Sequence, residues 1–187
     1  DGRLKNFDFT EKRKIIFSNK KNSLPETGIV FIDAHHKEVC RQKSEEEGSI
    51  VKDNYNQLLG STFLDENNNK KIITEKDILV VAPYNVQVNY LKSILPKNAK
   101  VGTIDKFQGQ QAPATIISMT TSDQESLPRN IDFFFSRNRL NVAISRSQCL
   151  SIVIMNKRIL EISCKKIRHM HLVNTFMKLL EFERSPN

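Results

Sequence analysis

The 187-residue sequence has no tryptophan, only six glycines and only three cysteines. The cysteines, at positions 40, 149 and 164, lie far apart and are odd in number, which argues against a disulfide framework and a Cys-x-x-Cys metal site. No apolar run approaches the ~20 residues that cross a bilayer, and the chain does not open on an apolar segment with a cleavage site. We therefore expect a cytoplasmic protein with no membrane segment.

The usual phosphate-binding loops are also missing, because neither G-x-x-x-x-G-K-S/T nor G-x-G-x-x-G occurs. An apolar segment ending at Asp33 is similar to a magnesium-holding strand. However, Ala34 follows where a second acid would help, so an ordinary strand-end residue is the stronger interpretation. His35, His36 and Cys40 lack a fourth ligand at a zinc-like spacing. No metal site is predicted.

The formal net charge is +8, from 29 Lys and Arg against 21 Asp and Glu. Such an excess attracts phosphate-rich partners and speeds their association. The basic residues are scattered, however, and the same charge can serve solubility alone. Charge by itself therefore favours nucleic-acid binding only slightly.

From Gly28 onward, apolar β-preferring runs alternate with segments of helical spacing. Strands are expected over residues 29–33, 78–82, 101–104, 115–119 and 150–155. A capping box from Ser44 to Glu47 begins a helix that stops near Gly60, and further helices are expected over 86–95, 138–146 and 170–182. This alternation predicts an α/β fold with a mainly parallel, doubly wound sheet covered on both faces.

The amino-acid composition divides the chain into two parts. Residues 1–27 are polar and basic and are expected to form an irregular lead-in arm. Residues 28–187 form the domain itself, with residues 65–71 as a surface loop and the last helix closing the fold. We find no internal repeat and no low-complexity tract.

Residues 82–87 contain a Pro83-Tyr84 step at the expected start of a helix. This step exposes an aromatic ring and backbone N–H groups that suit a nucleic-acid phosphate. A capped helix with a packed tyrosine is an equally open interpretation. In residues 101–111 the glycines, including Gly109, allow a backbone to approach a phosphate.

Residues 138–146 carry Arg139 and Arg146, which are seven positions apart and fall on one helical face. A planar guanidinium suits phosphate oxygens, and an arginine from a neighbouring domain can neutralise charge in phosphoryl transfer. Ordinary surface arginines are the alternative, which the clustering with Arg137 disfavours.

In this order the three segments resemble motifs IV, V and VI of superfamily 1 helicases. DILVVAPYNVQVNYL resembles motif IV, VGTIDKFQGQQAP motif V, ISMTTSD the piece after it, and NRLNVAISRS motif VI. The resemblance covers roughly residues 28–182 and is to the second RecA-like domain of the Upf-like branch. The residues of these motifs are most similar to those of bacterial proteins that fuse a RecB-like nuclease to such a helicase.

The resemblance implies half of an ATP-dependent motor that moves on single-stranded nucleic acid, with DNA expected. ATP and Mg²⁺ would lie between this domain and the first RecA-like domain of the same polypeptide, which would supply the Mg²⁺ ligands and the P-loop. The lead-in arm would come from that preceding domain. The isolated chain is then expected to be inactive.

The same resemblance assigns roles by position. Arg146 would be the arginine finger, Gly109 would approach the phosphates through its backbone, and Gln108 would couple the nucleotide cleft to the strand channel. Gln111 stands where the family has a glutamate that holds the ribose. A glutamine amide can still bond a ribose hydroxyl, but without charge assistance.

Contacts to the sugar-phosphate backbone would come from Pro83, Tyr84 and Thr103, with Asp105 and Arg139 as coupling residues. Two other classes of protein stay open. One is a non-enzymatic domain that binds single-stranded nucleic acid, and the other is an unrelated α/β phosphate-binding enzyme whose site is complete within this chain.

Overall fold

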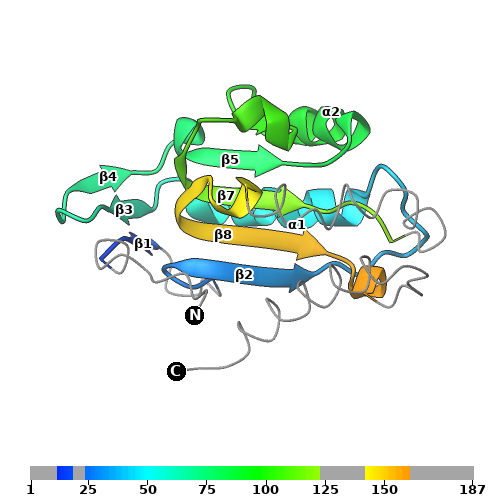
Figure 1. Ribbon diagram of the computed structural model, residues 1–187, viewed down its shortest axis with the longest axis horizontal. Coiled ribbons are helices and arrows are strands. Elements are labelled where there is room, and N and C mark those ends of the chain that lie inside the picture. The colour runs from blue at the N-terminus through cyan, green and yellow to red at the C-terminus, as the bar shows by residue number, and fades with distance from the viewer. Residues whose placement is uncertain (1–11, 19–23, 123–141, 161–187) are drawn as a thin grey trace, which may run out of the picture.

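The computed structural model describes residues 12–18, 24–122 and 142–160. Its centre is a five-stranded sheet in the order β2-β8-β7-β5-β6, in which every neighbouring pair runs parallel (Figure 1). The strands are β2 (Gly28–Asp33), β5 (Ile78–Val81), β6 (Lys100–Gly102), β7 (Ala112–Ser118) and β8 (Ser147–Met155). The expected α/β fold with a mainly parallel sheet is therefore confirmed.

The continuous apolar runs form strands because parallel strands are covered on both faces. All residues of β5 and β7 are buried. Along β5 the side chains alternate: Ile78 and Val80 join one apolar cluster, and Leu79 and Val81 join another. The sheet thus separates two apolar clusters. The side of the sheet with Ile78 and Val80 is here called the first face, and the side with Leu79 and Val81 the second face.

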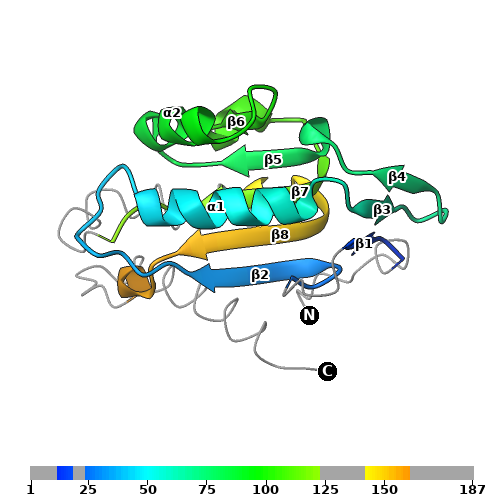
Figure 2. The same cartoon turned by 180° about the vertical axis from the view of Figure 1, so that it is seen from behind.

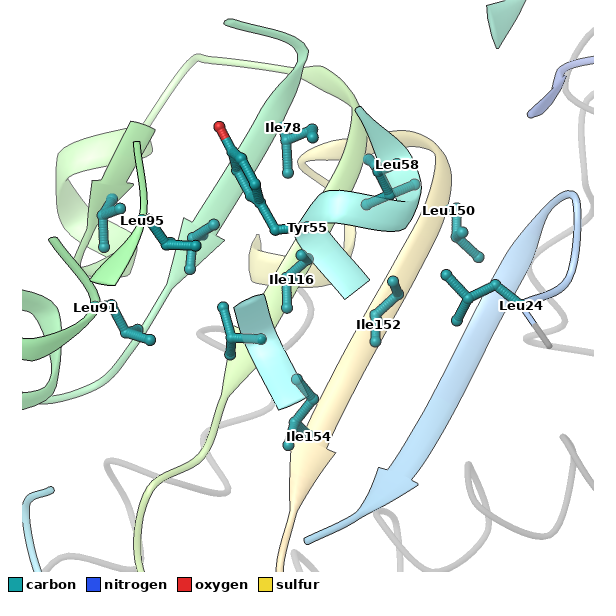
Figure 3. Packing of buried hydrophobic residues seen from close by; sticks show 14 of the residues in the cluster. Leu24, Tyr55, Leu58, Ile78, Leu91, Leu95, Ile116, Leu150, Ile152 and Ile154 are labelled. Carbon is teal, nitrogen blue, oxygen red and sulfur yellow. The ribbon is translucent and has the colours of Figure 1, made fainter. Parts of the chain in front are cut away.

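Within the described residues, the helices α1 (Glu45–Leu58) and α2 (Asn85–Ile94) cover the first face. Figure 2 shows α1 lying across the sheet in front of β7 and β8. Its buried residues Val51, Tyr55 and Leu58 pack in one cluster with Ile116 and Ile152 of the sheet (Figure 3). Burial raises the pKa of Tyr55 to about 12, so this ring stays neutral in the core.

Short elements cover the second face in the described part of the chain. They are the 3-10 helices η2 (Ile104–Phe107) and η3 (Lys157–Leu160) and a helical turn at residues 142–144. Ile104, Phe107, Ala143 and Ile159 are buried in the second cluster. The rest of the helix expected over 138–146 and the whole helix expected over 170–182 lie outside the described residues.

The N-terminus of α1 differs from the expected capping box. Ser44 caps the helix as predicted, its Oγ accepting from the backbone N–H of Glu47 at 3.1 Å. The carboxylate of Glu47 does not return to the Ser44 N–H, which instead donates to Oε1 of Gln87 at 2.9 Å. Only half of the capping box forms, because the Glu47 carboxylate has other partners in the interior.

A second, three-stranded sheet lies beside the amino ends of the parallel strands (Figure 1). Its order is β1-β3-β4, antiparallel throughout, with β1 (Lys14–Ile16), β3 (Thr62–Leu64) and β4 (Lys70–Ile72). Residues 65–71 are therefore not a simple surface loop, since residues 70 and 71 belong to a hairpin. Within the expected irregular arm, β1 contributes Ile15, which is fully buried in the first cluster.

The expected strand over 101–104 is also shorter than predicted. It ends at Gly102, and Ile104 already belongs to η2. The expected strand at 78–82 and the helix at 86–95 match β5 and α2 closely.

Asp77 ties the hairpin to the large sheet. It ends the 3-10 helix η1 (Glu75–Asp77) just before β5, and its carboxylate accepts from the backbone N–H and the hydroxyl of Thr74 at 3.0 and 2.7 Å. Lys71 of β4 forms a salt bridge to it. Burial by itself would raise the pKa of Asp77, but the hydrogen bonds from Lys71 and Thr74 outweigh it and hold the pKa below its ordinary value.

Asp77→Asn is expected to lower the free energy of unfolding by about 1 kcal/mol at neutral pH, since Lys71 is largely exposed and the charge pair is screened. A lowered pKa stabilises the fold above the unfolded carboxyl value, about 4, and that contribution is lost as the pH falls through the folded value. Urea unfolding at pH 7 and below pH 4 should show the two proteins converging in acid. An equal difference at both pH values would contradict this assignment.

Candidate functional site

The segments that follow β5 and β6 lie side by side at the carboxyl edge of the parallel sheet. The backbone N–H of Ala82 donates to the carbonyl of Gly102 at 3.1 Å. This bond brings the Pro83-Tyr84 step next to Thr103. Pro83 and Thr103 are both half-buried.

Tyr84 is the N-cap residue of α2 and has extended backbone, with φ −114° and ψ 138°. Its ring is half-buried and packs against the second cluster. The structure thus combines the two interpretations from the sequence: the ring packs on the core, and part of it remains accessible beside the helix start.

Gly102 lies close to side chains of η2, which favours a small residue at this position. A Cβ there would lie 2.6 Å from Cδ of Lys106 and 3.3 Å from the ring of Phe107. The Lys106 side chain is exposed and can turn aside, whereas the ring of Phe107 is buried, so a larger residue here would require small shifts in η2.

The chain crosses the second face between β6 and β7. Ile104 and Phe107 of η2 are buried, whereas Asp105 and residues 108–111 are exposed. Gly109 has φ +76° with nothing within 4 Å of a Cβ position, so backbone conformation and not space favours glycine there. The predicted residues Gln108, Gly109 and Gln111 therefore sit on an accessible crossing segment.

Arg146 and Gln111 lie next to each other at the amino edge of the sheet. They directly precede β8 and β7, and the N–H of Ala112 donates to the carbonyl of Arg146 at 3.0 Å. The half-buried guanidinium donates from Nε to the carbonyl of Val142 at 3.0 Å and from Nη2 to Oγ of Ser145 at 3.3 Å. Because a guanidinium carries five N–H donors, these bonds fix its position and leave donors for an anion.

The predicted residues thus form two groups at opposite edges. Pro83, Tyr84 and Thr103 lie where the strands end, and Gln111 and Arg146 lie where two strands begin, as the arrows of Figure 1 show for β5, β7 and β8. The general preference of ligands for the carboxyl edge of such sheets applies to the first group only. Arg139 lies outside the described residues.

Asp33, at the end of β2, pairs with a lysine. Its carboxylate accepts from the backbone N–H of Lys157 at 3.2 Å and lies 3.0 Å from its Nζ. His36 lies against Glu47, with 3.1 Å between Nε2 and Oε1.

Across residues 12–18, 24–122 and 142–160, no three His, Cys, Asp or Glu side chains gather to hold a metal ion. None of the helices in these ranges has the length and apolar character that a bilayer crossing needs.

A buried polar network at the carboxyl edge was missed by the sequence analysis. Its central residue, Glu47, reads in the sequence as a capping residue, and Gln87 reads as one position of a helix. The available signal was the placement of Gln87 three residues after Tyr84, on the face of α2 that turns toward the sheet. A buried glutamine there requires partners, and Glu47 and Ser118 belong to the same network.

A parallel α/β sheet with flanking helices is the architecture of a RecA-like domain. Residues 1–158 match a family model described as an AAA domain, and the chain therefore belongs to this family.

Sequence relatives narrow the class. The chain is 33% identical to the RNA helicase Mov10l1 of Mus musculus over 95 residues, which is 47% of this chain and 8% of the relative. It is 28% identical over 127 residues to the DNA polymerase alpha-associated DNA helicase A of Saccharomyces cerevisiae, covering 64% and 18%. With the protein of that name from Schizosaccharomyces pombe, identity is 39% over 74 residues, covering 38% and 11%.

Together with the fold, these matches support a helicase domain of superfamily 1. The chain spans between 8% and 18% of the length of these relatives. By name they include both RNA and DNA helicases. They give no support to the narrower resemblance to bacterial nuclease–helicase fusions.

Proposed function

We propose that this chain is the second RecA-like domain of an ATP-dependent helicase or translocase that moves along single-stranded nucleic acid. The observation that supports this most directly is the bond from Ala112 to Arg146, since it joins the exposed crossing segment to a fixed arginine. That pairing brings an exposed polar loop and a cation together where a neighbouring domain could present phosphates.

In this proposal Arg146 completes the ATP site as the arginine finger. Gly109 approaches the phosphates through its backbone, Gln111 bonds the ribose, and Gln108 links the nucleotide to the strand channel. The exposure of residues 108–111 and the fixed guanidinium fit a triphosphate held from one side. The first RecA-like domain would supply the P-loop and the Mg²⁺ ligands, and Mg²⁺ would offset charge on the phosphates.

The strand-binding surface is proposed at the other edge. Pro83 and Thr103 would contact the sugar-phosphate backbone, and the accessible part of Tyr84 would meet a base or sugar. Asp105, on the crossing between the two edges, and Arg139 are proposed to couple them. Because one sheet spans both groups, closure of the two domains over ATP would move the strand-binding edge as a rigid body.

The test is ATP hydrolysis by the complete parent protein and by the 187-residue chain, each with single-stranded DNA, single-stranded RNA and no nucleic acid. We expect strand-stimulated hydrolysis by the parent, none by the chain alone, and greater stimulation by DNA. Greater stimulation by RNA would overturn the DNA proposal alone. Hydrolysis by the isolated chain would mean that its site is complete, and the half-motor proposal would fail.

A second candidate is a domain that binds single strands without catalysis. The net charge of +8 favours it, and so does the bond from Ala82 to Gly102, which places the segments beginning at Pro83 and Thr103 side by side on one surface of this chain. It requires salt-dependent strand binding by the parent protein with no effect of nucleotide. A dependence of strand affinity on bound nucleotide would exclude it.

Two narrower proposals rest on the sequence alone. The cysteine usage supports a cytoplasmic location. The residues of the helicase motifs suggest the group of bacterial proteins that fuse a RecB-like nuclease to such a helicase, which divalent-cation-dependent degradation of DNA by the parent protein would test.

A further inference from the structure

Glu47 is a fully buried carboxylate in the first turn of α1. Its Oε2 accepts from Oγ of Ser118 at 2.6 Å and from the backbone N–H of Thr120 at 2.8 Å. Its Oε1 lies 3.1 Å from Nε2 of the buried His36. One side chain therefore joins α1, the segment after β2 and the end of β7.

Gln87 extends this network into α2. Its Nε2 donates to Oγ of Ser118 at 3.2 Å and to the carbonyl of Ser44 at 3.0 Å, and its Oε1 accepts from the Ser44 N–H. Gln87 lies in the same first helical turn that Tyr84 caps. Ser118 thus connects Glu47 to the helix start that carries the proposed strand contact.

The end of β7 is strained at Thr120, which has φ +73° although its side chain is β-branched. Such a conformation persists only where its surroundings determine it. Here the Thr120 N–H bonds to Glu47, and the Ser122 N–H donates to the carbonyl of Cys40 at 2.9 Å. Loss of the Glu47 carboxylate would leave a buried N–H unpaired beside a strained residue.

A buried carboxylate at this position costs desolvation energy that an apolar side chain would avoid. Its contacts instead select one relative placement of four segments that meet at the carboxyl edge. All four lie at the same edge as Pro83, Tyr84 and Thr103, and none of the network's bonds reaches the Gln111–Arg146 group at the other edge.

We propose that Glu47 is a positioning residue for strand binding, acting through Ser118 and Gln87 on the first turn of α2 and through Thr120 on the exit of β7. It does not touch nucleic acid or nucleotide. This inference rests on the proposed function. It holds that the network affects the binding of single-stranded nucleic acid and not the binding of ATP.

The experiment compares Glu47→Ala, Glu47→Gln and Ser118→Ala in the complete parent protein. Strand-stimulated ATP hydrolysis gives the half-saturating concentration of single-stranded DNA and the KM for ATP. If Glu47 only stabilises the fold, its loss should change the half-saturating DNA concentration and the KM for ATP together. If Glu47 is a positioning residue, its loss should change the half-saturating DNA concentration alone. Ser93→Ala is the matched control, because Ser93 lies on the exposed side of α2 and bonds only within its own helix, to the carbonyl of Tyr90.

Glu47→Ala is expected to raise the half-saturating DNA concentration about tenfold and Ser118→Ala several-fold, with the KM for ATP within about twofold of wild type. Glu47→Gln should restore DNA binding to within about threefold, since its amide can accept from Ser118 and Thr120 and donate to His36. Ser93→Ala should match the wild type.

The proposal is overturned if a folded Glu47→Ala or Ser118→Ala protein binds DNA like the wild type, if the KM for ATP rises in parallel, or if Glu47→Gln fails to restore binding. If Glu47→Ala does not fold, the result for Ser118→Ala alone decides the proposal. This variant removes one hydroxyl and keeps the bond between Glu47 and the Thr120 N–H. A wild-type parent without strand-stimulated hydrolysis would instead refute the proposed function.

Discussion

Replacing Arg146 by alanine in the complete parent protein is expected to lower ATP turnover by about 10³-fold or more, with strand affinity nearly unchanged. The guanidinium lies at the amino edge of the sheet, away from Pro83 and Thr103, so its loss should affect one ligand only. Two hydrogen bonds hold it against the turn at residues 142–145. Little ordering is then needed when phosphates arrive.

Two further variants make this measurement specific. Arg146→Lys keeps the charge but loses the planar fork, and it should recover only part of the lost turnover. Arg158→Ala removes an exposed arginine just past the opposite end of β8 and should leave turnover near the wild-type value. If Arg146→Ala turned over ATP like the wild type, the arginine-finger assignment would be wrong.

Ile152→Ala is expected to lower the free energy of unfolding of the chain by about 2–5 kcal/mol. Ile152 is fully buried in the middle of β8, in register with Val30 of β2 and Ile116 of β7. Figure 3 shows it among the side chains of the first face. The strands on both sides are hydrogen-bonded to β8, so they cannot easily close the cavity.

Urea denaturation followed by circular dichroism measures this loss. Val86→Ala is the control: it trims a side chain that is 47% exposed on α2 and should cost within about 0.5 kcal/mol. A loss below about 1 kcal/mol for Ile152→Ala would show that the centre of the sheet relaxes around the cavity.

Most of the parallel strands were predictable because each contains a run of apolar, β-preferring residues, such as Ile29–Ile32 in β2 and Ile78–Val81 in β5. The hairpin was not, since β4 reads Lys-Lys-Ile with all three residues exposed, and a strand without a buried face leaves no pattern. The end of the strand expected over 101–104 was misjudged, because Val101 and Ile104 are both apolar but belong to different elements. Ile104 is buried as expected, but by a 3-10 turn that crosses the second face.

The candidate site shows the same limit. The resemblance to helicase motifs named the candidate residues, but the proximity of the Pro83-Tyr84 step to Thr103 became visible only in the structure. Arg146 lies at the amino edge of the sheet, whereas Pro83 and Thr103 lie at the carboxyl edge. The spacing of residues along the sequence does not show at which edge each segment lies in the fold. Glu47 was read as a local cap because its partners, Ser118 and Thr120, are more than seventy positions away.

The strand order has a consequence for how the domain folds. β8 lies between β2 and β7, and Gly28 in β2 pairs with Leu150. Until β8 is in place, β2 has no neighbour among the described strands of the sheet and β7 has an open edge. Contacts between residues so distant along the chain slow folding, and open edges favour association with other chains. We expect the entry of β8 between its neighbours to limit the folding rate, with misassembly concentrated in the time before it.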